Sequence, residues 1–335
     1  MKAIALISGG LDSSLAAGFV KRLGIEVIGL HCRIPFYPRQ KKQVLSAQEY
    51  AGRMSAILGI EIKTVELGED FLEMAGNPKF GYGHNINPCI DCRILMLRKA
   101  GVLMEAEQAR FVVTGEVLHQ RGMSQHREAF HTIDKESGLE GFIVRPLSAR
   151  LLPQTIPEKE KWLNRDDLLG WSGRTRKPQI RLAEELGIRE YPNPAGGCLL
   201  TDPGFSRRMK DMIVAGGLQM EDIELLKWGR HFRISPKAKL VIGRDQREGE
   251  QIAAFARGGD YLFMPPEEIA GPTVLGRGEF NGQLIELACR LTCFYCDNSA
   301  KIDSMEIVCA RLPERREFRL AVSPLDSPEV ESLRI

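Results

Sequence analysis

The sequence lacks the features of a membrane-bound or secreted protein. No apolar run approaches the roughly 20 residues that a membrane span needs, and no signal peptide is visible before the first strand-like stretch. An excess of one charge is lacking too, because 46 Lys and Arg face 44 Asp and Glu. We therefore expect a cytoplasmic protein whose eight cysteines are thiols, metal ligands or redox groups, not disulfides.

Two common phosphate motifs are missing from the glycine-rich turn near the N-terminus. The turn lacks the Gly-Lys-Ser/Thr ending of a Walker A loop and the third glycine of a dinucleotide fingerprint. It joins a strand-like run, residues 2–7, to a helix-like run, residues 15–20, and it reads Ser8-Gly9-Gly10-Leu11-Asp12-Ser13-Ser14. The two glycines let the backbone approach a ligand. The N–H groups of the first helical turn and the serine hydroxyls form a nest that suits phosphate.

The turn resembles the S-G-G-x-D-S signature of the PP-loop ATP pyrophosphatases. That resemblance implies that ATP is cleaved between its α and β phosphates, that the loop holds the pyrophosphate, and that Asp12 is linked to Mg²⁺. It also implies an α/β fold with a parallel, doubly wound domain of the adenine nucleotide α-hydrolase type.

The pattern of the first 150 residues or so favours the same fold, because strand-like and helix-like segments alternate. We expect strands at 26–31, 60–67 and 111–114 and helices at 43–58 and 90–108. Ligands bind beyond the carboxyl ends of the strands in such sheets, so Ser8, His31 and Gly115 are expected around one crevice that holds ATP. His31 either packs on the adenine or caps its strand.

Three cysteines stand at turns of the kind that expose a side chain. Cys89 and Cys92 form a C-x₂-C at a loop-to-helix junction, where helix N–H groups are expected to lower the pKa values of the thiols, and Cys198 follows a Pro/Gly-rich turn. Three thiols with an open fourth position are typical of a 4Fe–4S cluster with one free iron. A redox pair with a persulfide carrier and a zinc site are the alternatives.

A second resemblance covers about the first 200 residues. The run from Val113 to Gln125, together with Val144-Arg145-Pro146-Leu147, is similar to segments of the tRNA thiouridine synthases, in both the 2-thiouridine and the 4-thiouridine branches. It implies that a uridine carbonyl oxygen of tRNA is adenylated by ATP and the AMP is displaced by sulfur from a cysteine desulfurase or inorganic sulfide. Asp12, Cys89 and Cys198 are then catalytic, and Cys89, Cys92 and Cys198 hold the cluster. The cofactor-binding residues are Ser8, Gly9, Gly10, Asp12, Ser13, Ser14, His31, Gly115 and Gln125.

At 335 residues the chain exceeds the usual size of a single core, and we expect more than one domain. The predicted division is a PP-loop domain at 1–170, a helical bridge at 171–226 that carries Cys198, and a smaller α+β domain at 227–335. The last is similar to the RNA-binding domain of NFACT proteins. Residues 172–181 and 227–244 are cationic without an acid, which favours contact with an RNA backbone.

A further cysteine group has the C-x₃-C-x₂-C spacing of radical-SAM enzymes. Too few residues follow Cys289, Cys293 and Cys296 for a barrel, and their spacing puts them on one face of a helix. We expect these thiols, and those of Cys32 and Cys309, to pack in the core.

Two functions other than tRNA thiolation stay open. One is an RNA-binding translation-quality factor with a non-catalytic PP-loop. The other is a PP-loop enzyme that inserts sulfur or nitrogen into a small molecule. The oligomeric state is open as well.

Overall fold

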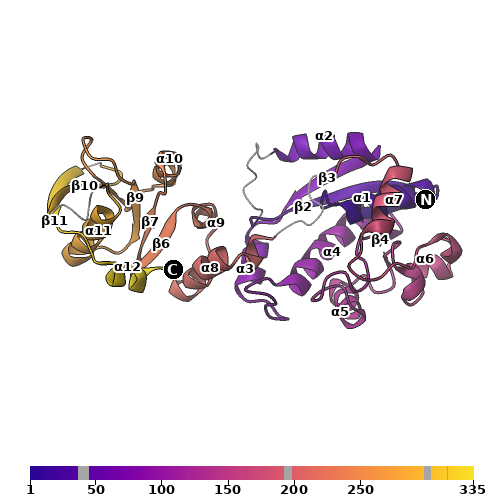
Figure 1. The fold of residues 1–335 in the computed structure, drawn as a ribbon. Coiled ribbons are helices and arrows are strands. Elements are labelled where there is room, and N and C mark those ends of the chain that lie inside the picture. The colour runs from indigo at the N-terminus through magenta and orange to yellow at the C-terminus, as the bar shows by residue number, and fades with distance from the viewer. Residues whose placement is uncertain (37–44, 192–197, 298–302, 315) are drawn as a thin grey trace. The chain divides into compact units, whose positions relative to one another are not determined.

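The computed structural model describes residues 1–36, 45–191, 198–297, 303–314 and 316–335. They divide into two compact units, residues 1–201 and 202–335 (Figure 1). The boundary between the units, after residue 201, falls within the segment 171–226 that was predicted as a helical bridge. Within the described residues, no helix is both long and apolar enough to cross a membrane.

A five-stranded parallel sheet organises the first unit. Its strands are β1 (Lys2–Leu6), β2 (Glu26–Arg33), β3 (Glu61–Glu66), β4 (Phe111–Val113) and β5 (Ile143–Val144). Their order is β3-β2-β1-β4-β5, and each neighbouring pair is parallel. The chain builds outward from β1 to β3 and then crosses to β4, so the topological switch point lies between β1 and β4. The predicted doubly wound parallel sheet is confirmed.

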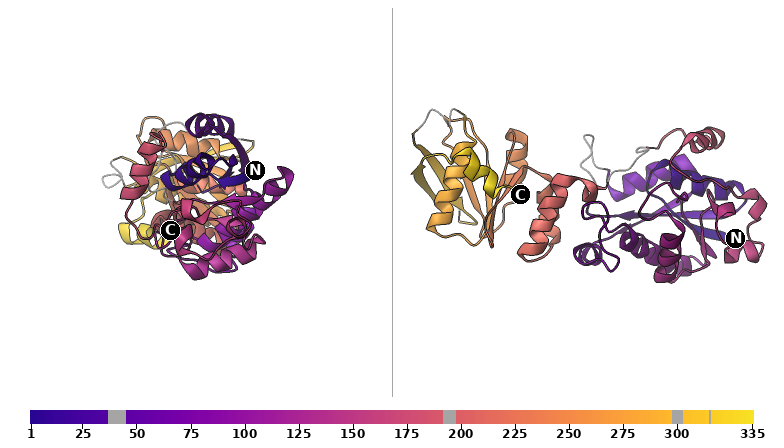
Figure 2. Two further views of the ribbon diagram at one scale, coloured as in Figure 1. Left: turned by 90° about the vertical axis from the view of Figure 1, so that its right-hand side faces the viewer. Right: turned by 60° about the horizontal axis from the view of Figure 1, so that its bottom comes forward.

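Helices cover both faces of this sheet (Figures 1 and 2). They are α1 (Leu11–Arg22), α2 (Ala47–Leu58), α3 (Glu69–Gly76), α4 (Cys89–Ala106), α5 (Arg127–Ser137), α6 (Ile156–Lys159) and α7 (Lys177–Glu185). Short 3₁₀ turns lie at Ala149–Leu151, Arg165–Asp167 and Leu199–Thr201. Ala3 and Ala5 of β1 share one core cluster with Leu15, Met54 and Leu182, which places α1, α2 and α7 on the same face. The small alanines let α1 pack close to the strand that leads into it.

The helix expected at 43–58 is observed as α2, where Ser46 and Glu49 form a reciprocal capping box. The expected start at residue 43 lies outside the described residues. This cap fixes the first turn of α2 and thereby the position of Tyr50, which lies one turn into the helix.

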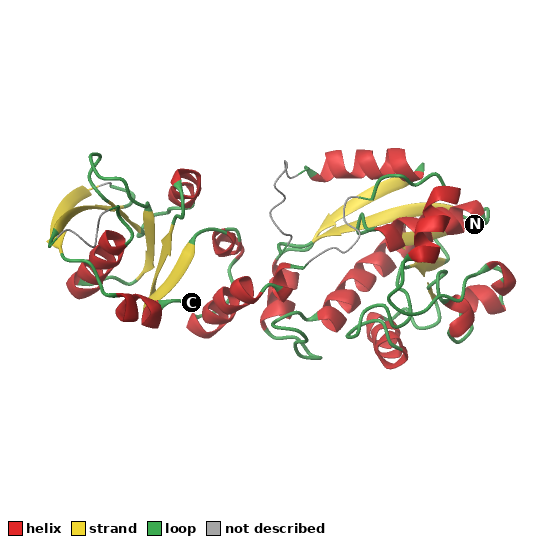
Figure 3. Cartoon of the chain, viewed as in Figure 1, coloured by secondary structure: helices red, strands yellow, loops and turns green. Residues whose placement is uncertain are grey.

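The second unit contains a six-stranded sheet in which each neighbouring pair is antiparallel (Figure 3). Its strands are β6 (Arg230–Ser235), β7 (Ala238–Ile242), β8 (Tyr261–Met264), β9 (Val274–Gly278), β10 (Met305–Arg311) and β11 (Arg316–Val322), in the order β11-β10-β8-β9-β7-β6. Its helices are α8 (Pro203–Ala215), α9 (Met220–Ile223), α10 (Gln246–Ala254), α11 (Gly282–Phe294) and α12 (Ser327–Leu333), with a 3₁₀ turn at Leu225–Lys227. This is the predicted smaller α+β domain, although the sequence analysis did not identify β6, β10, β11 or α12.

Two apolar clusters cover opposite faces of this second sheet. Leu240 belongs to the larger cluster, with α11 and α12, whereas its neighbour Val241 belongs to the smaller one, with Ile252 of α10. Because successive side chains of a strand point to opposite faces, the sheet is enclosed on both sides near β7.

Candidate functional site

The PP-loop occupies the switch point of the first sheet, between the end of β1 and the start of α1. Gly9 has φ +73°, a conformation that favours glycine, and Gly10 is extended at the N-cap of α1. Gly10 has no side chain that could cap α1, and no capping hydrogen bond to this N-terminus is found in the described part of the chain. The first N–H groups of this helix are therefore left to an anion or to water.

Serine hydroxyls brace the loop from inside. The Ser8 N–H donates to Ser13 Oγ over 3.2 Å, and Ser13 Oγ donates to the Gly10 carbonyl over 3.0 Å. The two hydroxyls are themselves 3.1 Å apart. Ser14 is fully buried, and its hydroxyl has no hydrogen-bond partner among the described residues. These hydrogen bonds fix the shape of the loop from within the protein.

Asp12 is held by a side chain that the sequence analysis did not single out. Gln120 Nε2 donates to Asp12 Oδ2 over 2.6 Å, while the buried Oδ1 has no hydrogen-bond partner in the described structure. Burial raises the pKa of Asp12, and this outweighs the lowering by Gln120, Arg176 and Arg121. One carboxylate oxygen is therefore positioned and the other is available to a cation.

Gly115 approaches this loop so closely that no side chain fits. A Cβ at residue 115 would lie 2.4 Å from the backbone carbonyl carbon of Asp12 and 2.5 Å from the Ser13 nitrogen. The segment after β4 therefore lies against the first turn of α1. This is at the carboxyl ends of the strands, where the sequence analysis expected the ATP crevice.

His31 lies at the same edge, but its ring is covered by the protein. Its Nδ1 is 2.8 Å from the Ile7 carbonyl, and its ring stacks on Tyr50 with centroids 3.8 Å apart. Burial lowers the pKa of His31 to about 4, so the ring is neutral at pH 7 and Nδ1–H donates to the carbonyl. This geometry ties β2 to β1 and favours the strand-capping alternative over direct packing on adenine.

Tyr50 was missed by the sequence analysis. A Cβ on Gly9 would lie 2.6 Å from the Tyr50 hydroxyl oxygen, so this phenol lies directly over the PP-loop. Gln125, another predicted cofactor-binding residue, accepts a backbone hydrogen bond from the His119 N–H. Its side chain is buried, and its Oε1 has no hydrogen-bond partner among the described residues.

The three thiols singled out in the first unit are electrostatic neighbours. Cys198 and Cys89 both raise the pKa of Cys92, and Cys89 raises that of Cys198. Cys89 opens α4 and Cys92 follows one turn later. The structure therefore brings together side chains that are more than 100 residues apart in the chain.

The lowered thiol pKa values expected at the start of α4 are wrong. Burial raises the pKa of Cys92 to about 12 and that of Cys198 to about 11, and it raises the pKa of Cys89 as well. Arg93 lowers the pKa of both Cys89 and Cys92, but removal of the thiolate from water has the larger effect. Across the residues that the structure describes, no three His, Cys, Asp or Glu side chains form a group that could hold a metal ion.

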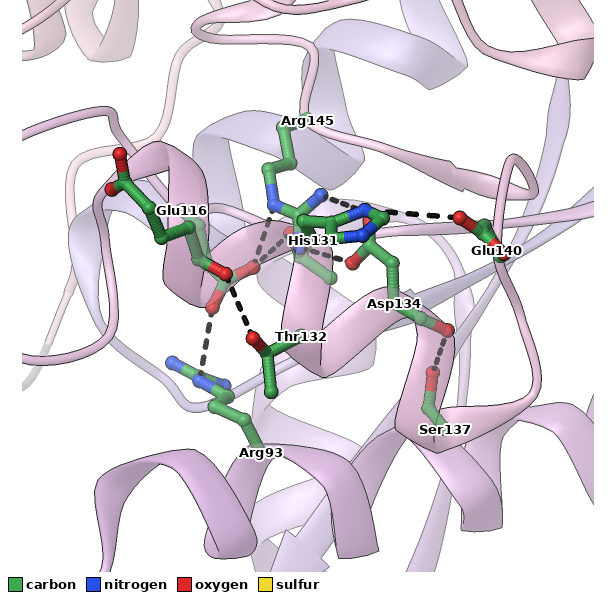
Figure 4. A network of polar contacts seen from close by, with 10 residues as sticks. Arg93, Glu116, His131, Thr132, Asp134, Ser137, Glu140 and Arg145 are labelled. Atoms are coloured by element: carbon green, nitrogen blue, oxygen red, sulfur yellow. Dashed lines mark hydrogen bonds and ion pairs between the residues drawn. The ribbon is translucent and has the colours of Figure 1, made fainter. Parts of the chain in front are cut away.

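A buried ionic network fixes the helix that carries this thiol pair (Figure 4). Glu116, at the end of β4, contacts Arg145 Nε over 2.9 Å and Arg93 Nε over 3.3 Å, and Arg145 reaches Asp134 of α5 over 2.6 and 2.9 Å. Burial works to raise the pKa of Glu116, but Arg145 and Arg93 together bring it below its usual range. The network joins α4, next to Cys92, to the carboxyl ends of two strands.

The second cysteine group is part of a core, as predicted. Cys289, Cys293 and Cys296 are buried in the larger apolar cluster of the second unit, and Cys289 Sγ lies 3.3 Å from Cys309 Sγ. Cys32 is buried in the first unit.

The two cationic segments differ in exposure. In residues 172–181, Arg174, Lys177 and Arg181 are exposed. In residues 227–244, by contrast, Lys239 is buried and Arg233 is paired with Asp211. The second segment therefore does not form one continuous cationic surface.

Comparison with known proteins finds one family-model match within each unit. Residues 1–150 match the family described as thiamine biosynthesis protein (ThiI), and residues 229–334 match the NFACT protein RNA binding domain. The chain is similar to a tRNA-specific 2-thiouridylase (MnmA) of Thermoanaerobacter sp. strain X514, with 26% identity across 72% of this chain and 68% of that protein. It is also similar to the tRNA-specific 2-thiouridylase of Acidothermus cellulolyticus, with 24% identity across 74% of this chain and 70% of that protein.

Two solved structures give weaker likenesses. A 4-thiouridine synthetase in complex with RNA and ATP has 18% identity and a TM-score of 0.38, across 68% of this chain and 52% of that one. The C-terminal part of the fibronectin/fibrinogen-binding protein from Streptococcus suis has 12% identity and a TM-score of 0.29, across 73% of this chain and 94% of that one. The resemblance found in the sequence is confirmed by the family matches: a PP-loop unit like those of the tRNA thiouridine synthases is followed by a C-terminal domain like the NFACT RNA-binding domain.

Proposed function

We propose that the protein is an ATP-dependent tRNA sulfurtransferase that converts a uridine carbonyl into a thiocarbonyl. The observation that carries this proposal is the uncapped, serine-braced PP-loop in the same unit as three neighbouring thiols. The similarity to tRNA-specific 2-thiouridylases supports tRNA as the substrate.

The PP-loop would bind the β and γ phosphates of ATP. Its free N–H groups at the start of α1 and the Ser14 hydroxyl supply donors to phosphate oxygens, and the positive end of the helix favours negative charge there. Asp12 Oδ1 fits a Mg²⁺ ligand, because it is a carboxylate oxygen without a hydrogen-bond partner in the described structure. Bound Mg²⁺ would neutralise charge on the departing pyrophosphate.

The reaction consists of two displacements. The uridine carbonyl oxygen attacks the α phosphorus of ATP, and pyrophosphate leaves into the PP-loop. A sulfur nucleophile then attacks the pyrimidine carbon that carried this carbonyl oxygen, and AMP leaves with the oxygen. Adenylation is needed because a carbonyl oxygen is a poor leaving group, and the loop stabilises charge that develops during the first step.

We assign sulfur delivery to Cys89, Cys92 and Cys198. Their chemistry suits a 4Fe–4S cluster, as the resemblance implies, but their described arrangement is not a metal-binding group. The alternative is a persulfide on one of these thiols, formed by transfer of sulfane sulfur from a cysteine desulfurase. After its outer sulfur attacks the substrate, a second thiol of the group would release the thiouridine and leave a disulfide that an external thiol reduces. Inorganic sulfide, as the other donor, would act directly as the nucleophile, without a persulfide. Iron and acid-labile sulfide assays on anaerobically purified protein distinguish the two, with about four irons per chain expected for the cluster.

RNA is expected to contact the exposed cations of residues 172–181 and the NFACT-like domain. Binding through phosphates releases counterions, so affinity for tRNA should fall steeply with salt.

The test is pyrophosphate release from ATP with and without unmodified tRNA, followed by analysis of the tRNA for thiouridine. We expect release that requires tRNA, and loss of both signals in Asp12→Asn, which keeps the hydrogen bond to Gln120. Release that needs no RNA would favour the small-molecule alternative. Tight tRNA binding with no release under any condition would favour the non-catalytic RNA-binding factor.

A further inference from the structure

Gln120, which holds Asp12, is itself held by a residue from a distant part of the chain. Gln179 Nε2 donates to Gln120 Oε1 over 3.0 Å, and Gln120 Nε2 donates to Asp12 Oδ2 over 2.6 Å. Gln179 belongs to the first half of α7, and its side chain is completely buried. The two amides therefore form a chain of hydrogen bonds from α7 to the PP-loop.

A buried glutamine at position 179 is less favourable for packing than an apolar side chain. Gln179 Oε1 is buried without a hydrogen-bond partner among the described residues. An unsatisfied buried acceptor destabilises the folded protein, and an apolar side chain of similar volume would avoid that cost. The feature that such a side chain could not supply is the N–H that Gln179 donates to Gln120.

The same part of the chain is tied to the Gln120 loop a second time. The Gly173 N–H donates to the Leu118 carbonyl over 2.8 Å. Ser148 Oγ accepts from the Leu118 N–H over 3.0 Å and donates to the Trp171 carbonyl over 2.7 Å. The cationic segment 172–181 is thus anchored near both of its ends to the loop that positions Asp12.

The outer surface of α7 faces the solvent at the point where the inner surface holds Gln120. Lys177 and Arg181 flank Gln179 in the sequence and are exposed, and Arg176 at the N-cap is close enough to lower the pKa of Asp12. A phosphate backbone bound to these cations would act on the same short helix that positions the carboxylate.

We propose that Gln179 is a positioning residue, which fixes the Asp12 carboxylate through Gln120 and couples the cationic segment 172–181 to the PP-loop. The coupling rests on the proposed function: RNA bound at α7 would alter the position of Asp12 and thereby the rate of ATP cleavage. Gln179 is completely buried and reaches Asp12 only through Gln120. Its effect is on the orientation of Asp12, and hence on turnover more than on ATP binding.

The first experiment compares Gln179→Leu with Glu184→Gln, a control on the exposed side of the same helix. In tRNA-dependent pyrophosphate release, we expect Gln179→Leu to lower kcat about tenfold with KM for ATP within twofold, whereas the control should match the parent. The double variant Gln120→Leu/Gln179→Leu should lose no more than Gln120→Leu alone, because Gln179 acts through Gln120. Parental kcat in Gln179→Leu, or additive losses in the double variant, would overturn the proposal.

The second experiment needs no enzymatic activity. In protein labelled with ¹⁵N-glutamine, the side-chain amide of Gln120 should exchange its hydrogens at least about tenfold faster in Gln179→Leu than in the parent or in Glu184→Gln. Gln179→Met is the second variant to measure where the leucine variant does not fold. An unchanged exchange rate of the Gln120 amide in a folded variant would contradict the proposal. If the parent shows this protection but cleaves no ATP with tRNA, the proposed function fails while the positioning by Gln179 stands.

Discussion

The two cysteine groups of this chain resemble one another in spacing and differ in surroundings. Cys89 and Cys92 open a helix whose second turn is tied by the half-buried Arg93 to a buried glutamate, and Cys198 joins them from a distant segment. Cys289, Cys293 and Cys296 lie within a helix among apolar side chains. Spacing identifies neighbouring thiols in both groups, but the three thiols of the candidate site are half-buried and have charged neighbours, whereas those of the second group are buried among apolar side chains.

The largest expected effect is on thiouridine formation, which should depend on the first cysteine group and not on the second. Cys198→Ala should abolish thiouridine formation, with a loss of at least about a thousandfold, because a nucleophile or ligand of the sulfur site is removed. Cys296→Ala should keep the activity. The measurement is thiouridine content of tRNA after single-turnover incubation, with iron content determined in parallel. Equal losses in the two variants would remove the distinction between the groups.

The next effect compares the loss of a buried ionic contact in the first unit with the loss of an exposed ion pair in the second. Arg145→Met leaves Glu116 and Asp134 without their main buried partner and should destabilise the first unit by about 3–5 kcal/mol. Arg319→Met removes an exposed pair with Glu306 in the second unit and should cost less than about 1 kcal/mol. Denaturant unfolding followed by probes in each unit measures both. A small effect of Arg145→Met would mean that the network does not stabilise the α4 region.

Thiol reactivity gives a third contrast, through its pH dependence. Cys198 has a pKa raised to about 11, so its thiolate fraction rises about tenfold per pH unit up to that value. In iron-free protein at pH 8, iodoacetamide should modify Cys198 roughly a hundredfold more slowly than a free thiol, and faster as the pH rises. Cys289 and Cys309, fully buried, should react only after unfolding. A rate at Cys198 that levels off near pH 8 would contradict the raised pKa.

The smallest effect tests the apolar assignment. Cys293→Ser places a hydroxyl where the thiol is fully buried, and should destabilise the second unit by about 1–3 kcal/mol. Cys293→Val, also apolar, should be tolerated better unless overpacking dominates. The unfolding transition of the second unit is the measurement, and pyrophosphate release should be unchanged in both variants.

Much of the first unit could be predicted because its signals are local. The PP-loop sequence lies between an apolar strand and a helix, and the alternation that follows is enough to predict a parallel sheet. Gly115 was identified by its place at a strand end, and the structure supplies the reason in its approach to Asp12. That these residues bind ATP, Mg²⁺ or a cluster stays a prediction.

The partners of the loop could not be predicted in this way. Tyr50 reaches the PP-loop from α2, Gln120 reaches Asp12 from beyond β4, and Gln179 reaches Gln120 from α7. No local pattern marks these contacts, because each joins segments that come together only when the sheet is assembled. The strands β10 and β11 were missed for a related reason, since a sequence window contains no record of the strand with which it pairs.

From the sequence alone came the motif, the first four strands of the PP-loop unit with the helices observed as α1, α2 and α4, and the choice of cysteines to consider. The tertiary structure alone decided the ionic state and accessibility of those residues: it raised the thiol pKa values, gave Asp12 its partner, and buried Lys239 within a segment that reads as cationic. The physical reason is the range of the forces involved. Backbone preferences act over a few residues, whereas desolvation and charge pairing depend on atoms that distant segments bring into contact.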